Sequence, residues 1–517
     1  MVKLKKKLFR DSIFLILLGM ATSLSLPPFN YFLINFFSFT FFFIFLFKKL
    51  NSQKLKKYFF LYGWLFGFGY FLTNLYWISI SLTFDKSFKF LIPIAIILIP
   101  AFLAIFYGLV SYLFMIFKTN QIIKSFLIFS LIFSILEFIR GSILTGFPWN
   151  LIAYSFVNQL EIISIISIIG TYGFNLFCIS LFSCPALLIL GKSNKETFVF
   201  IFFIICLSVS YLHGFQYKKK FNASNEIKQN YKIRAIGSSI SLERFYSSNN
   251  PVSIIKELIK ISNPSLSEKT IFIWPEGILP DISQEELAEY KWLFENKFSK
   301  NHIITLGINN QTTINNSSKY FNTFSIYDHE LNLINSYNKI KLVPFGEFLP
   351  LENFLSIIGL KSITNNYQSY SKGNKRKIIE IKRKDFSLKI LPLICYEIIY
   401  SGEIFKENDF DLIINISEDG WFGKSIGPKQ HFAHSIFRSI ESGKYTIRSA
   451  NNGISAVINP IGVIEKSLDL KENGYIDFTE SRKIQPTIFS KYGNKIFLLL
   501  ILLYIFLIFS FNKIENE

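Results

Sequence analysis

The stretch Leu388-Lys389-Ile390-Leu391-Pro392-Leu393-Ile394-Cys395-Tyr396-Glu397 places a thiol directly after an apolar run typical of a buried β-strand. Cys395 is the only cysteine between residues 216 and 490, and the other three lie in long apolar runs (Cys178, Cys184 and Cys206). A lone cysteine without a disulfide partner is either a small buried hydrophobe or a nucleophile. Both interpretations stay open on this stretch alone.

Two upstream motifs favour the nucleophile. Trp274-Pro275-Glu276-Gly277 offers an acid, and Tyr337-Asn338-Lys339, which runs into Leu342–Glu347, offers an amine. A thiol with a pKa of about 8.5 is mostly protonated at neutral pH. A carboxylate can take its proton, and an ammonium can stabilise the thiolate and a developing oxyanion. We therefore expect Glu276 as the base and Lys339 as the cation, although a capped strand end and a solvated lysine are the structural alternatives.

Apolar residues gather towards the two ends of the chain. The 517 residues are 50% hydrophobic and 18% aromatic, with 60 Phe, which is too apolar for a soluble enzyme of this length. Because a helix needs about 20 apolar residues to cross a bilayer core, we predict about eight spans. The expected division is a transmembrane domain with seven helices at 1–215, a catalytic domain at 216–490, and a final transmembrane helix with a short cytoplasmic tail at 491–517. The predicted spans are 11–27, 29–47, 58–82, 90–117, 122–140, 160–190, 197–214 and Ile496–Phe511.

Basic residues in the short loops predict the orientation, because cytoplasmic loops carry an excess of Lys and Arg. Lys3, Lys5, Lys6, Lys7 and Arg10 precede the first span, and further lysines occupy every second loop. This pattern predicts a cytoplasmic N-terminus and an outward-facing catalytic domain. In a bacterium, that means a multi-pass protein of the inner (cytoplasmic) membrane with its catalytic domain in the periplasm. A cleaved signal peptide at 1–26 is the alternative, against which Pro27-Pro28 indicates a hairpin into the second span.

The net charge of +19 does not indicate a nucleic-acid partner, because the lysines are scattered and no basic-aromatic motif accompanies them. Contact of the span-flanking lysines with anionic membrane lipid explains the charge better. His431 and His434 could share a metal from one face of a predicted helix. No acidic or cysteine ligand set accompanies them, so we predict no metal and no cofactor.

The middle of the chain alternates strand-like and helix-like runs, which predicts a layered α/β domain. The polar stretch 216–230 is interpreted as a linker, and 309–318 and 371–385 as exposed loops. The predicted strands are Thr270–Trp274, Ile303–Ile308, Thr323–Tyr327, Leu388–Ile394, Leu412–Ile416 and Ile454–Ile458; the predicted helices are Val252–Ile261, Gln284–Lys297 and Pro428–Ser442.

Glu276, Lys339 and Cys395, in this order and context, resemble the Glu-Lys-Cys triad of the nitrilase (carbon–nitrogen hydrolase) superfamily, which implies an α-β-β-α sandwich. Further motifs over nearly the whole chain are similar to those of one branch, the apolipoprotein N-acyltransferases. These motifs are Glu137-Phe138-Ile139-Arg140-Gly141, Thr145-Gly146-Phe147-Pro148-Trp149, Leu342–Pro350, Gly420-Trp421-Phe422-Gly423, Gly427-Pro428-Lys429-Gln430-His431 and Arg448-Ser449-Ala450-Asn451-Asn452-Gly453.

The resemblance implies an acyl transfer in two half-reactions. Cys395 would take the sn-1 acyl chain of a phospholipid, typically phosphatidylethanolamine, as a thioester. The α-amino group of the N-terminal diacylglyceryl-cysteine of a lipoprotein would then receive it. The resemblance also implies supporting roles in the active site for Glu347, Tyr396 and Glu397.

Two departures from the family pattern stand out. Members often have Asn-Asp before the Trp-Phe-Gly motif, whereas this chain has Glu418-Asp419. The family's Gln-x-Asn-Ile-Pro stretch with a following Trp is eroded here to Gly237–Ser241, then Phe245. Neither departure touches the triad, but both could alter how substrate docks.

Two other functions stay open on the sequence. A membrane-anchored amidase or nitrilase-type hydrolase would use the same triad and release its acyl group to water, although it has no need of eight spans. A transporter or receptor with an inactive outer domain is the second alternative. The scarcity of intramembrane charges, limited to Glu137 and Arg140 near a span end, argues against it.

Overall fold

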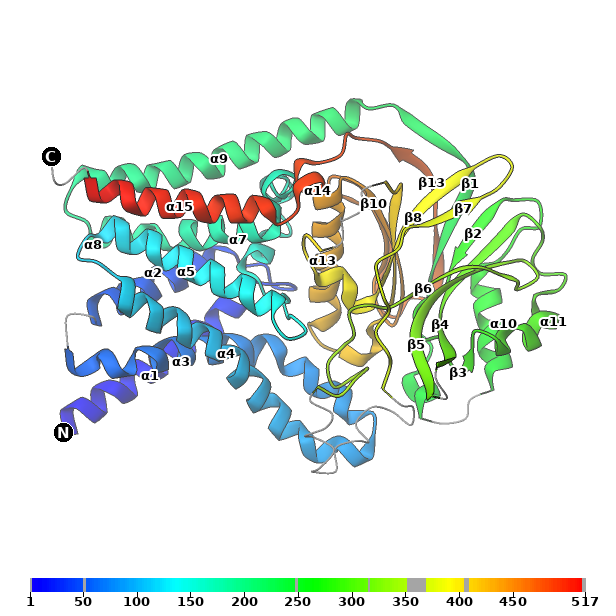
Figure 1. Cartoon of the computed structure of the whole chain (residues 1–517), viewed down its shortest axis with the longest axis horizontal. Coiled ribbons are helices and arrows are strands. Elements are labelled where there is room, and N and C mark those ends of the chain that lie inside the picture. Colours follow the sequence, from blue (N-terminus) through cyan, green and yellow to red (C-terminus); the bar gives the residue numbers. More distant parts are fainter. Residues whose placement is uncertain are drawn as a thin grey trace.

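The computed structural model describes residues 2–49, 53–246, 250–314, 317–350, 369–403 and 409–513. It consists of a bundle of helices and a two-sheet α/β sandwich that pack end to end (Figure 1). The helix α1 (Val2–Ser23) begins, and α15 (Lys495–Lys513) ends, at the end of the bundle away from the sheets (Figure 1).

Within the described ranges, five helical segments are long and apolar enough to cross a membrane, and α15 contains a shorter apolar stretch, Lys495–Ser510. The prediction of about eight spans therefore stays a prediction for α1, α2 and α15. The remaining bundle helices are α2 (Leu33–Lys49), α3 (Phe59–Leu75), η2 (Tyr76–Thr83), η3 (Lys86–Leu91), α4 (Ile92–Phe117), α5 (Ile122–Ser142), α6 (Leu160–Ile163), α7 (Ile166–Ser183), α8 (Pro185–Leu190) and α9 (Asn194–Ala223), with short η1 (Gln53–Tyr58) and η4 (Ile152–Phe156).

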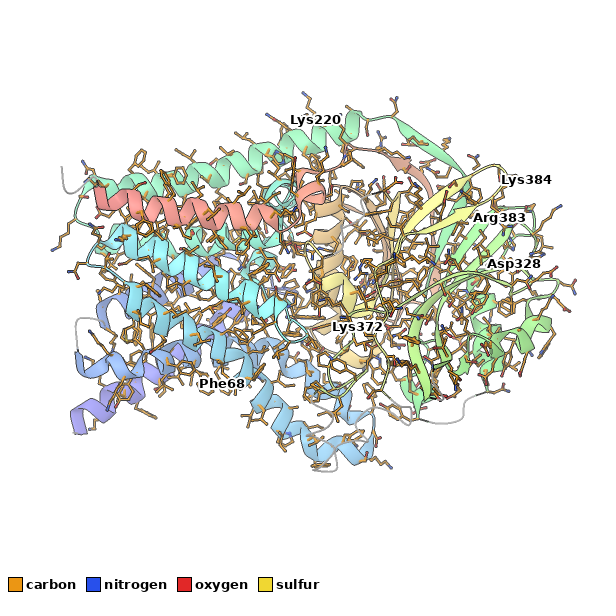
Figure 2. The ribbon with its side chains drawn as sticks, viewed as in Figure 1. Phe68, Lys220, Asp328, Lys372, Arg383 and Lys384 are labelled. Carbon is orange, nitrogen blue, oxygen red and sulfur yellow. The ribbon has the colours of Figure 1, made fainter. Side chains whose placement is uncertain are left out.

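The interpretation of 216–230 as a linker is wrong. The helix α9 starts at a capping box on Ser193 and continues to Ala223, so that Lys220 lies on its last turn beside the sandwich (Figure 2). Lysine is a good helix former, and its charge does not interrupt a helix whose surface is exposed. The strand β1 then begins at Glu226.

The sandwich has two mixed sheets. One has the order β13-β1-β2-β4-β5-β6, with β3 on β4, and the other has the order β12-β11-β10-β9-β8-β7. The first sheet contains β1 (Glu226–Gly237), β2 (Thr270–Ile273), β3 (Leu279–Ser283), β4 (His302–Ile314), β5 (Ser317–Asp328), β6 (Leu333–Asn338) and β13 (Gly474–Arg482); the second contains β7 (Ile379–Lys382), β8 (Ser387–Ile394), β9 (Leu412–Glu418), β10 (Tyr445–Asn451), β11 (Ser455–Ile458) and β12 (Ile464–Leu468).

Alternation along each strand divides the apolar residues between two cores. Ile271 and Ile273 of β2 face the second sheet, whereas Phe272 and Trp274 face an outer layer that contains α10 (Pro251–Ser262), η6 (Glu286–Tyr290) and α11 (Lys291–Phe294). The helix α13 (Gly427–Ser442) covers the outer face of the second sheet and shares one continuous core with the bundle. The layers are therefore α-β-β-α, with α13 between sheet and bundle (Figure 1).

Two stretches interpreted as exposed loops contain strands. Residues 309–314 extend β4 into a hairpin with β5, and residues 315–316 lie outside the described residues. Within 371–385, β7 pairs with β8, because Ile379 and Ile381 are buried while their neighbours face out. Arg383 and Lys384 lie at the far tip of that hairpin, away from the bundle (Figure 2). The predicted helix Gln284–Lys297 is two short turns, η6 and α11.

Candidate active site

Three of the predicted site residues follow the carboxyl ends of strands. Glu276 follows β2, Lys339 follows β6, and Cys395 follows β8. The sheets bring them together with Glu347, which comes from the loop after β6. All except Glu347 are buried, with exposures of 6% for Glu276, 1% for Lys339 and 9% for Cys395.

Cys395 occupies a sharp turn between β8 and the short helix η9 (Cys395–Ile399). Its φ of 45° lies in the left-handed region, which costs free energy for any residue with a side chain. A carboxylate oxygen of Glu397 accepts the Ile394 N–H at 3.0 Å and supports this turn. Strain of this kind, held by the surrounding structure, is typical of a residue whose side chain must point in one direction.

Lys339 is the electrostatic centre of the site. Its Nζ lies 3.1 Å from Glu276 Oε1 and 2.9 Å from Glu347 Oε1. Burial disfavours the ammonium, but the two carboxylates, with a further contribution from Cys395, outweigh it and hold the pKa of Lys339 well above its ordinary value. Lys339 is therefore a fixed cation at neutral pH.

Asn322 is a site residue that the sequence analysis missed. Its Nδ2 donates to Glu276 Oε1 at 2.7 Å and to Glu347 Oε1 at 2.8 Å, so it bridges the same two oxygens as Lys339. The available signal was a polar residue directly before the predicted strand Thr323–Tyr327. Its distance in sequence from both carboxylates concealed the contact.

The second carboxylate oxygen of Glu276 accepts the backbone N–H of Glu418 at 3.1 Å. A close approach of strand β4 supports the acid from behind, because a Cβ at Gly307 would lie 2.7 Å from Glu276 Cα. Glu347 is held similarly, since its Oε2 accepts the Val343 N–H at 2.8 Å. Both carboxylates are thus oriented by the backbone before any substrate binds.

Glu397 and Tyr396 do not bind Lys339 Nζ as Glu276 and Glu347 do; they hold the chain segments around the site. Glu397 Oε1 accepts from Tyr337 Oη at 2.7 Å and from the Ile340 N–H at 3.0 Å, on either side of Lys339. Tyr396 Oη donates to the Gly146 carbonyl of the bundle at 2.9 Å. Glu397 therefore fixes the segment that carries Lys339, and Tyr396 fixes the turn at Cys395 against the bundle.

The thiol is in a largely protonated state at neutral pH. Burial and the Glu276 carboxylate raise the pKa of Cys395 well above its ordinary value, and Lys339 and a hydrogen bond with Ser417 oppose them. Attack by this thiol would need a base to take its proton, and Glu276 is the carboxylate that interacts with it most strongly.

His431 contacts the backbone of the Cys395 turn and not the thiol. Its Nε2 is 3.3 Å from the Cys395 carbonyl and its Nδ1 is 2.9 Å from Asp419 Oδ1, while Arg448 bonds the same carboxylate. Both ring nitrogens therefore face oxygen acceptors. Within the residues that the structure describes, no group of three or more His, Cys, Asp or Glu could hold a metal ion.

Comparison with known sequences covers both parts of the chain. The apolipoprotein N-acyltransferase N-terminal domain matches residues 18–184, and the carbon-nitrogen hydrolase family matches residues 267–483. The apolipoprotein N-acyltransferase of Rickettsia prowazekii (strain Madrid E) is 33% identical over 515 residues, 99% of this chain and 100% of the relative. That of Rhodopseudomonas palustris is 30% identical over 84% of this chain and 82% of its own length.

Among solved structures, a mutant amidase from Nesterenkonia sp. AN1 overlaps 49% of this chain and 91% of its own, at 12% identity and a TM-score of 0.33. The sequence relationships are far closer and extend over bundle and sandwich alike. This chain belongs to the apolipoprotein N-acyltransferase family.

Proposed function

We propose that this protein is a membrane enzyme that N-acylates lipoproteins, and that it does so through a thioester on Cys395. Family membership supports the activity. The observation that carries the mechanism is the buried cluster in which Lys339 contacts Glu276 and Glu347 and interacts electrostatically with the Cys395 thiol. Acyl transfer through a thiol needs a nucleophile, a base that takes its proton and a group that stabilises the oxyanion, and a thiol, a carboxylate and an ammonium can fill these roles.

In the first half-reaction, Glu276 accepts the thiol proton as Cys395 Sγ attacks the sn-1 ester carbonyl of a phospholipid. Lys339 stabilises the negative charge that develops on the carbonyl oxygen. The carbon–oxygen bond then breaks, Glu276 returns the proton to the glycerol oxygen, and a lysophospholipid leaves. The acyl chain remains on sulfur as a thioester.

In the second half-reaction, the α-amino group of a diacylglyceryl-cysteine attacks the thioester carbonyl. Glu276 accepts a proton from the attacking nitrogen, the carbon–sulfur bond breaks, and the proton returns to the thiolate. The products are an amide and the free enzyme. Exclusion of water from the buried site favours the amine over hydrolysis.

The membrane arrangement is part of the proposal. Eight spans would comprise α1, α2, α3 with η2, α4, α5, α7 with α8, α9 and α15, with the sandwich on the periplasmic side of the inner membrane. The start of α1 and the end of α15 on the bundle's far side support an even number of spans (Figure 1). The domain division is proposed at 224–225, because α9 passes residue 215 without a break. Phosphatidylethanolamine is the proposed acyl donor.

The test is intact-mass analysis of the full-length protein after incubation with phosphatidylethanolamine. We expect one added acyl group on a peptide that contains Cys395, sensitive to hydroxylamine and absent in Cys395→Ser. Parallel incubation with phosphatidylglycerol tests the choice of donor. Addition of a diacylated lipopeptide should then give a triacylated peptide. Release of free fatty acid alone would favour the hydrolase, and lipopeptide acylation by Cys395→Ser would overturn the thioester.

A further inference from the structure

The two segments in which this sequence departs from the family pattern lie against each other beside the candidate active site. Arg244 lies in the short helix η5 (Leu242–Phe245), and Glu418 is the last residue of β9. Their side chains form an ion pair and are 0% and 1% exposed. A buried charge without its partner is strongly disfavoured, so the two residues depend on each other.

The Arg244 guanidinium also holds the backbone next to Glu276. Its Nε and Nη2 lie 3.3 and 3.2 Å from the carbonyl oxygen of Gly277, the residue that follows Glu276. Further bonds go to the Ile240 carbonyl at 3.2 Å and the Ser241 carbonyl at 2.8 Å. One side chain therefore joins the eroded segment to the chain on one side of the proposed base.

Glu418 holds Glu276 from the other side. Its backbone N–H donates to Glu276 Oε2 at 3.1 Å, and its carboxylate accepts from Asn451 Nδ2 at 2.7 Å and from the Gly420 N–H at 2.8 Å. The ion pair thus closes a loop of contacts from Gly277 through Arg244 and Glu418 back to the Glu276 carboxylate.

The same pair fixes an aromatic contact on the side that faces the bundle. Phe245 follows Arg244, Trp421 follows Glu418 by one turn of η10 (Asp419–Phe422), and the two ring centroids are 5.0 Å apart. The Trp421 ring also meets Phe84 of the bundle at 5.9 Å. Displacement of either charged residue would move both the base and this aromatic group.

We propose that Arg244 and Glu418 are a coupled pair of positioning residues that fixes the Glu276 carboxylate for proton transfer to and from substrate. This inference deepens the proposed function and rests on it. The pair touches neither the thiol nor Lys339, so it acts through Glu276. It predicts a loss in the rate of acylation rather than in lipid binding.

The experiment compares the full-length protein with Glu418→Gln, Arg244→Lys and the uncharged double variant Arg244→Met/Glu418→Met. Single-turnover acylation of Cys395 by phosphatidylethanolamine, KM for that lipid and Tm are measured for each. Glu418→Gln leaves the buried Arg244 charge unpaired and should lower Tm most. For the double variant we expect a Tm closer to wild type, because no buried charge is left unpaired, but acylation about 10- to 100-fold slower with KM little changed. Arg244→Lys keeps the positive charge but loses the several N–H donors of the guanidinium. Its acylation rate should lie between those of the wild type and the double variant.

The control is another bidentate ion pair, Arg234 with Asp477, whose side chains are 6% and 21% exposed. It joins β1 to β13 through two contacts of 2.7 Å and makes no contact with the site. Arg234→Met/Asp477→Leu should acylate at the wild-type rate. The inference is overturned if the Arg244/Glu418 double variant acylates at the wild-type rate, or if the control is slowed equally. A wild-type protein that forms no acyl-enzyme would instead overturn the proposed function.

Discussion

The bundle and the sandwich bury their side chains in different ways. The bundle packs rings and glycines: Phe42 stacks on Phe66 at 4.2 Å, and a Cβ at Gly63 would lie 2.1 Å from the Tyr107 carbonyl. The sandwich buries charged groups such as Lys339, each with several partners within hydrogen-bond distance. Apolar packing is non-directional, whereas charged hydrogen bonds fix position. The bundle therefore serves as a framework that tolerates small changes, whereas the positions of the buried charged groups in the sandwich depend on individual hydrogen-bonding atoms.

The largest contrast is expected between two buried cysteines. Cys395→Ala should lower acyl transfer to a diacylated lipopeptide by about 10⁴-fold or more, because no other group can carry the acyl chain. Cys178→Ala removes a buried thiol of α7 that packs within the bundle core, and should keep transfer near wild type. Appreciable turnover by Cys395→Ala, measured by mass spectrometry of the lipopeptide, would contradict the assignment.

A second contrast separates a buried lysine from an exposed one. Lys339→Met should slow acylation of Cys395 by about 10²- to 10³-fold, because the oxyanion loses its cation and Glu276 and Glu347 lose the charge between them. The control Lys269→Met removes a surface lysine, 43% exposed, that pairs with Asp385. It should leave single-turnover acylation unchanged, and an equal loss in both variants would show that Lys339 has no special role.

The charges around the thiol can be tested by pH. Burial and Glu276 raise the pKa of Cys395, so its alkylation by iodoacetamide should increase with pH to a midpoint above the ordinary value of about 8.5. Removal of a negative neighbour favours the thiolate, so Glu276→Gln should move the midpoint down. Removal of the cation disfavours it, so Lys339→Met should move the midpoint up. Shifts in the opposite directions would refute this electrostatic account.

The smallest expected effects concern the stability of the contact between α13 and the bundle, and of the bundle itself. Gln430 of α13 accepts from Trp149 Nε1 at 2.9 Å and from Trp77 Nε1 at 3.2 Å. Gln430→Ala leaves both indole N–H groups buried without that acceptor and should cost about 1–3 kcal/mol. Leu499→Ala on the exposed face of α15, where the side chain is 63% exposed, should change stability by less than about 0.5 kcal/mol. Thermal unfolding in detergent compares them.

The sequence located the parts of the fold in which one face is continuously apolar. Thr270–Trp274 and Leu388–Ile394 predicted β2 and β8 closely, because β2 is buried throughout and β8 is buried from Ile390 to its end. The strand β6 was missed, since Leu333–Asn338 is largely polar and lies at the edge of its sheet. The predicted span at 160–190 starts too early: α6 is separate, and one candidate span covers Ile166–Leu190. Gly170, with φ 68°, lies near its start and packs against Phe489.

The candidate site was predictable where a sequence motif identified it, as for Glu276, Lys339 and Cys395, of which Glu276 and Cys395 also follow predicted strands. Contacts that arise only from the way strands and sheets pack together could not be predicted. Asn322 reaches the carboxylates because β5 lies beside β6, and Arg244 meets Glu418 because the sheets face each other. Glu418 looked like an isolated departure from the family pattern, since its partner is far away in sequence.

The sandwich is attached through neighbouring strands at one edge. The strand β1 follows α9 and pairs antiparallel with β13, the last strand before α14 (Ile488–Tyr492) and α15. Arg482, the last residue of β13, binds the chain that enters β1: its Nη1 donates to the carbonyls of Asn222 and Ser224, and its Nη2 donates to the Glu226 carboxylate. Chain entry and departure therefore coincide, which is the arrangement that lets a whole domain be inserted into a host protein without disturbing either fold. The sandwich is thus a single insertion between α9 and α14, and its first and last strands are paired neighbours.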